Sequence, residues 1–61
     1  MKMDSATMKK YRELSNEDKD RLHSLVTYLC EGEPYSAYEE TLYAYLNGIA
    51  DWKEDYNKFK S

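Results

Sequence analysis

The most regular pattern in this chain is a stripe of apolar and aromatic residues through its C-terminal part. Its members are spaced alternately by four and three residues, and five of the seven are aromatic: Tyr38, Leu42, Tyr45, Ile49, Trp52, Tyr56 and Phe59. Such spacings put side chains on one face of an α-helix. The pattern therefore predicts one long helix from Ser36 to Lys60.

The start of this helix has two interpretations. Ser36 is a good N-cap, and Glu39 three residues later completes a capping box. Pro34 is also suited to the first helical position, because a proline there loses no hydrogen bond. Both interpretations place the start of the helix within two residues of Ser36.

The dipeptide Asn47-Gly48 is an ambiguity inside the predicted helix, because it often marks a helix C-terminus. The four-three rhythm nevertheless passes from Tyr45 to Ile49 without a change of phase. We therefore expect a continuous helix, with a kink or break near Gly48 as the alternative.

Two shorter helices are predicted before this one. Ser15 is a cap signal, and the acidic residues that follow it suit the positive end of a helix dipole. An apolar face then runs from Leu22 to Leu29, which predicts a helix from Asn16 to Glu31. Upstream, Asp4 or Ser5 could cap a short helix that reaches Leu14. No segment alternates as a strand would, so the prediction is an all-α domain of three helices over residues 1–61.

The predicted lengths leave part of the aromatic stripe without cover. A helix from Ser36 to Lys60 would be about 37 Å long, whereas a compact chain of this size is roughly 27 Å across. The second and third helices should pack antiparallel, and Trp52, Tyr56 and Phe59 would then extend past their contact. The first helix, a second copy of the chain or another protein could cover them.

Size and composition favour the last two of these. A domain of 61 residues has a marginal core. Cys30 is the only cysteine and His23 the only histidine, so neither a disulfide within the chain nor a metal site can support it. We therefore expect a homodimer, built by helix packing because the aromatic rings are too bulky for a two-stranded coiled coil.

Charge and hydropathy narrow the classes of partner. The net charge is −3, which disfavours general binding to nucleic acid. No apolar run is long enough for a membrane span, and nothing at the N-terminus resembles a secretory signal. A free thiol without an export signal predicts the cytoplasm.

Candidate chemistry is sparse. His23 and Cys30 are two helical turns apart, about 10 Å, which is too far for a nucleophile and its base. We predict no catalytic, cofactor-binding or metal-binding residue, and hence no enzyme. The N-terminal segment is locally basic, so Lys9, Lys10 and Arg12 are the candidate contacts to nucleic acid.

The functional expectation is a small intracellular modulator or inhibitor that binds another protein. Its size fits inhibitors of the sort that phages and other mobile elements encode. Tryptophan and tyrosine are enriched in binding hot spots, so the predicted protein-binding residues are Trp52, Tyr56, Phe59 and Tyr45. The alternative is a helical DNA-binding transcriptional regulator that uses the basic N-terminal segment.

Overall fold

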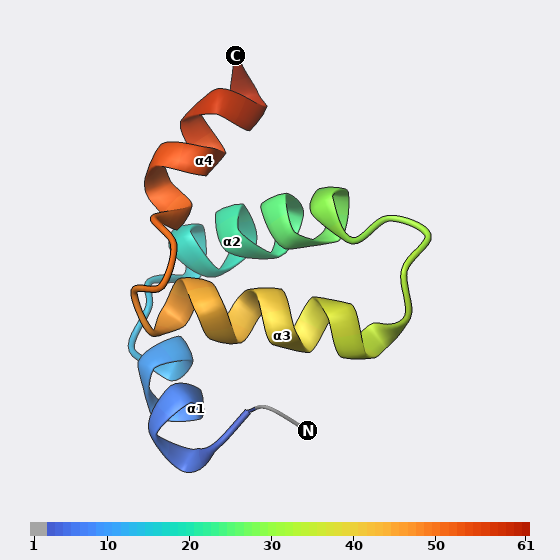
Figure 1. Cartoon of the computed structure of the whole chain (residues 1–61). Helices are drawn as coiled ribbons and strands as arrows, with labels where there is room; N and C mark the ends of the chain where they lie inside the picture. The colour runs from blue at the N-terminus through green and yellow to red at the C-terminus, as the bar shows by residue number, and fades with distance from the viewer. Residues whose placement is uncertain (1–2) are drawn as a thin grey trace.

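Four α-helices and no strand make up the part of the chain that the computed structural model describes, residues 3–61 (Figure 1). The helices are α1 (Ser5–Arg12), α2 (Asn16–Leu29), α3 (Tyr35–Leu46) and α4 (Trp52–Lys60). The all-α prediction is confirmed. The three-helix arrangement is wrong, because the predicted long C-terminal helix is two helices, α3 and α4.

The first two helices begin where the sequence predicts. Asp4 Oδ1 accepts a hydrogen bond of 2.8 Å from the backbone N–H of Thr7, and Ser15 Oγ accepts one of 3.1 Å from Asp18. The hydrogen bonds with Thr7 also hold the pKa of Asp4 below its usual value. Each side chain satisfies a backbone donor that the helix itself leaves free.

The C-terminus of α3 is a Schellman motif centred on Gly48. The N–H of Ile49 donates to the carbonyl of Ala44 at 3.0 Å, and the N–H of Gly48 donates to Tyr45 at 3.3 Å. This 6→1 and 5→2 pattern requires a residue in the left-handed region, which glycine adopts without steric penalty. Gly48 has a φ of 73°. The helix therefore ends at Asn47-Gly48, and the prediction of a continuous helix is wrong.

A new helix begins at Trp52, four residues after Gly48. Asp51 Oδ1 accepts hydrogen bonds from the backbone N–H groups of Lys53 and Glu54, at 3.1 and 3.3 Å. Asp51 is thus the N-cap of α4, with Glu54 at the third helical position. Ile49 falls in the connecting loop and is 71% exposed. Its predicted place in the apolar stripe of one long helix is therefore also wrong.

The start of α3 agrees with neither interpretation of its cap. Pro34 occupies the N-cap position with extended backbone angles, and Tyr35 is the first helical residue. Ser36 lies inside the first turn, and α3 has no side-chain cap. The N–H of Ala37 instead donates to the carbonyl of Pro34 at 2.9 Å. The expected capping box of Ser36 and Glu39 does not form.

The core lies between α2 and α3, which run side by side in opposite directions (Figure 1). Its buried side chains come from these two helices: Leu22, Leu25, Val26, Leu42 and Tyr45. Helix α1 packs on α3, and α4 packs on α2. The molecule measures 33 × 26 × 20 Å, so an unbroken helix of about 37 Å would exceed its longest dimension. Within residues 3–61, no helix has the length and apolar character needed to cross a bilayer.

Candidate functional site

Helix α4 brings its aromatic residues back onto α2. Trp52 and Tyr56 are half-buried and pack against the core, whereas Phe59, one turn further, is 38% exposed. The sequence interpretation left these three residues beyond the reach of α2. Because the chain turns at the Schellman motif of Gly48 before α4 begins, these residues lie against α2 instead.

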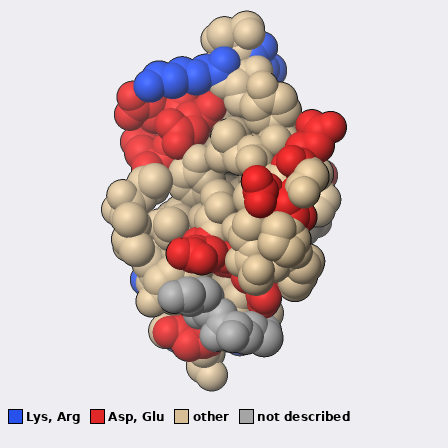
Figure 2. All heavy atoms as spheres, turned by 45° about the vertical axis from the view of Figure 1, so that its right-hand side comes forward, with Lys and Arg blue, Asp and Glu red and all other residues tan. Residues whose placement is uncertain are grey.

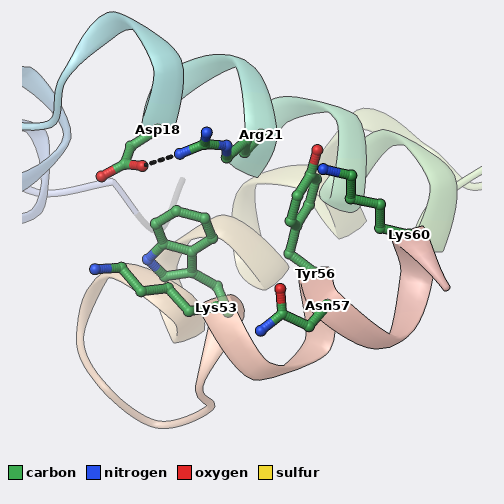
Figure 3. Close-up of a pocket in the computed structure, with 7 residues that line it drawn as sticks. Asp18, Arg21, Lys53, Tyr56, Asn57 and Lys60 are labelled. Carbon is green, nitrogen blue, oxygen red and sulfur yellow. Dashed lines mark hydrogen bonds and ion pairs between the residues drawn. The ribbon is translucent and has the colours of Figure 1, made fainter.

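A groove of about 330 Å³ runs between α2 and α4 (Figure 3). Two residues of α2 line one wall, and the rest of the lining comes from α4: Asp18, Arg21, Trp52, Lys53, Tyr56, Asn57 and Lys60. Figure 3 places Lys53 and Lys60 toward opposite ends of this set, with Tyr56 and Asn57 between them. The groove therefore combines an aromatic floor with cationic ends.

Charges on the α2 wall are already paired. Arg21 contacts Glu17 at 3.1 Å and Asp18 at 3.2 Å, both within one helix. The pair with Glu17 has the i,i+4 spacing that favours such contacts on a helix, as does the pair of Glu54 and Lys58 at 3.4 Å. Among residues 3–61, no ion pair involves Lys53 or Lys60.

Positive charge is unevenly distributed over the surface. In Figure 2 acidic side chains are spread over the face shown, whereas basic atoms gather at the top, which is the C-terminal end of α4 in Figure 1. A large acidic group lies directly beneath these basic atoms in the same view, so positive and negative charge adjoin at this end of the molecule.

An aromatic cluster continues the groove toward the C-terminus. The ring of Phe59 lies 4.9 Å from that of Tyr28 and 5.9 Å from that of Tyr56, measured between centroids. Tyr28 comes from α2 and is 59% exposed. We call Tyr28, Tyr56 and Phe59 the aromatic cluster. Sequence reasoning missed Tyr28, since only the break at Gly48 brings α4 against α2.

Tyr45 has a different environment from the rest of the predicted binding set. Its side chain is 7% exposed, and its hydroxyl donates to Asp55 Oδ2 at 2.8 Å. Burial raises the pKa of Tyr45 to about 12, and the hydrogen bond to Asp55 adds to the shift. Tyr45 therefore lies in the core, joins α3 to α4 and is too buried to form part of a binding surface.

The three basic residues predicted to contact nucleic acid lie on α1. Lys10 Nζ donates to Asn47 Oδ1 at 2.9 Å, so this ammonium is engaged within the chain. Lys9 and Arg12 are exposed. Tyr11 is half-buried, with the Lys19 ammonium 5.7 Å from its ring centroid. Its ring is thus partly covered rather than free to stack on a base.

His23 and Cys30 have separate partners. His23 Nδ1 is hydrogen-bonded to the Tyr38 hydroxyl at 2.7 Å, and Cys30 Sγ lies 3.4 Å from Thr41 Oγ1. Burial raises the pKa of Tyr38. Within residues 3–61, no three side chains of His, Cys, Asp or Glu are grouped closely enough to hold a metal ion.

Comparison with known proteins gives no guide to the function, which has to be inferred from this geometry. No protein-family model, curated protein or solved structure matches the chain. The groove between α2 and α4, with the aromatic cluster at its C-terminal end, is the surface on which a function can be argued.

Proposed function

We propose that the protein is a small, non-enzymatic binding module that acts as a modulator or inhibitor of another protein. Its binding surface is the face formed by α2 and α4. The observation that carries the proposal is the aromatic cluster, in which Tyr28 and Phe59 are in contact with each other and still 59% and 38% exposed. Exposed aromatic groups held in fixed positions supply large contact areas at low entropic cost.

The groove supports the same proposal. It adjoins the cluster through Tyr56, which lines the groove and contacts Phe59. A partner that covers Phe59 and Tyr28 would also reach the polar groups along α4, and binding hot spots are commonly surrounded by such polar rims. The homodimer was predicted from an over-long helix, and that reason for expecting self-association is lost because the helix is broken into α3 and α4.

Affinity capture from the native cell tests the proposal with matched variants. We expect wild-type protein to retain a partner and the variant Phe59→Ala to lose it. Tyr35→Ala is the control, because Tyr35 is 72% exposed and stacks on Tyr38 rather than on the cluster. Circular dichroism must show equal helicity in both variants. Equal capture by both would contradict the proposal.

A helical DNA-binding regulator is the second candidate, supported by the exposure of Lys9 and Arg12 on α1. Binding through phosphate contacts weakens steeply between low and physiological salt. Binding through an aromatic surface changes little over that range. A salt titration of the captured complex, with Lys9→Gln and Arg12→Gln as variants, distinguishes the two candidates.

A further inference from the structure

Two lysines of α4 face the groove without an ion-pair partner among residues 3–61. Lys53 and Lys60 line it, whereas Lys58 is paired with Glu54. On the opposite wall Arg21 and Asp18 neutralise each other at 3.2 Å. The charges of Lys53 and Lys60 therefore remain to act on whatever enters the groove.

The position of Lys53 is unfavourable for the helix to which it belongs. It is the second residue of α4, and a cation in the first turn opposes the helix macrodipole. Asp51, Glu54 and Asp55 show that acidic residues suit this turn. The helix macrodipole thus gives no reason for a lysine at this position, whereas a role in the groove does.

The aromatic floor adds an apolar component to the site. Trp52 and Tyr56 form this floor and are half-buried. The Lys53 ammonium lies 5.8 Å from the Trp52 ring centroid. That ammonium is therefore held beside an apolar surface rather than far out in solvent. An occupant that combines carboxylates with an apolar side chain matches both features.

The spacing of the lysines sets the scale of such an occupant. Lys53 and Lys60 are two helical turns apart, about 10 Å along the axis. Asn57 lies between them and offers an amide (Figure 3). An extended segment spans that length in about three residues. Two carboxylates of one short peptide segment can therefore contact both lysines at once.

We propose that this groove holds an acidic, partly apolar segment of the partner protein. This inference rests on the proposed function, because it specifies the chemistry of the partner recognised by the α2 and α4 face. The charge complementarity of Lys53 and Lys60 is what assigns an acidic occupant, and the floor of Trp52 and Tyr56 is what assigns it an apolar side chain.

Trp52 allows a direct test, because it is the only tryptophan in the chain and lines the groove. A short poly-glutamate peptide is titrated at low salt while Trp52 fluorescence is followed, with poly-glutamine as the uncharged comparison. We expect a saturable change with poly-glutamate alone. The double variant K53Q/K60Q should need about tenfold more peptide for half-saturation, since two ion pairs are lost.

The control variant is K9Q/K58Q, which lowers the net charge by the same amount on residues outside the groove. It should stay within about twofold of wild type. Equal weakening in the two double variants, or no saturable change in the wild type, would overturn the inference. Tighter saturation by a short DNA duplex than by poly-glutamate would also overturn it and assign the groove to nucleic acid.

Failure of this inference is distinguishable from failure of the proposed function. If K53Q/K60Q still captures the cellular partner while Phe59→Ala does not, the aromatic cluster binds a partner, and the proposal that the groove holds an acidic segment is refuted. If poly-glutamate binding depends on Lys53 and Lys60 while Phe59→Ala and Tyr35→Ala capture proteins equally, the groove assignment holds and the proposed binding surface does not.

Discussion

Two polar side chains, the buried Tyr45 and the half-buried Asn47, join helices that are far apart in the sequence. The Tyr45 hydroxyl bonds to Asp55 on α4. The Asn47 amide donates to Thr7 Oγ1 at 3.0 Å and to the Tyr43 carbonyl at 2.9 Å, which ties α1 to the end of α3. Both lie beside the loop that the sequence interpretation did not expect, so their partners could not be deduced from it.

The variant Tyr45→Phe should lower the free energy of unfolding by about 1–2 kcal/mol, because a hydrogen bond to a carboxylate is lost. Since the folded-state pKa is about 12 against an ordinary 10.0, this contribution is fully present below pH 10 and is lost as the pH rises toward 12. Urea unfolding at a series of pH values should show the stability gap between wild type and variant narrowing over that interval. A gap independent of pH would contradict the assignment.

The variant Asn47→Ala should cost about 1–3 kcal/mol, because it leaves the fully buried Thr7 hydroxyl without its donor. A double-mutant cycle with Thr7→Val isolates that contact. The two changes should be less harmful together than the sum of their separate effects. Asn57→Ala, at an exposed residue that lines the groove and makes no side-chain hydrogen bond within residues 3–61, should change the unfolding free energy by less than about 0.5 kcal/mol.

At the scale of helices, α2 and α4 are stabilised by side-chain N-caps, whereas α3 has none. We expect Ser15→Ala and Asp51→Ala each to cost about 1 kcal/mol. Ser36→Ala should have little effect, since α3 has no side-chain cap. Thermal unfolding followed by circular dichroism compares the three variants directly. A melting temperature lowered by Ser36→Ala as much as by Asp51→Ala would restore the predicted capping box.

The starts of the first two helices were predicted well, although both helices end two residues before the predicted ends, at Arg12 and Leu29. The C-terminal pair was not predicted. Ser15 and Asp4 cap α2 and α1 as expected. In the C-terminal half, the four-three spacing of apolar residues continues through the loop from Asn47 to Asp51 by coincidence. The spacing therefore predicted a helix where the chain is not helical. Two signals in the sequence correspond to the real structure better than this spacing does. Asn47-Gly48 marks the end of α3, and Asp51 with Glu54 marks the start of α4.

The candidate site depended on that same break. Trp52, Tyr56 and Phe59 could be identified as a surface of interest from their residue types and spacing. Their neighbours Tyr28 and Arg21 could not, because contacts between α2 and α4 exist only after the chain turns at Gly48. Burial of Tyr45 likewise follows from tertiary packing rather than from its place in the stripe.

For the whole molecule, the break changes the expected oligomeric state. The dimer was predicted to cover an aromatic strip that α2 now partly covers. We therefore expect light scattering at micromolar concentration to give about 7.3 kDa, the mass of one chain. A mass of twice that value, abolished by Phe59→Ala, would instead show that the aromatic cluster is a contact between two copies.

The hydrogen bonds of the Asn47 side chain also affect how long the protein stays chemically intact. Asn-Gly sequences deamidate readily, because the glycine N–H can attack the asparagine side chain with little steric hindrance. In the folded chain that amide is held by Thr7, Tyr43 and Lys10, and the Gly48 N–H donates to Tyr45. Folding therefore protects the bond that is most prone to ageing. An aspartate formed there could donate neither to the Tyr43 carbonyl nor to Thr7 Oγ1, so each damaged molecule would unfold more readily.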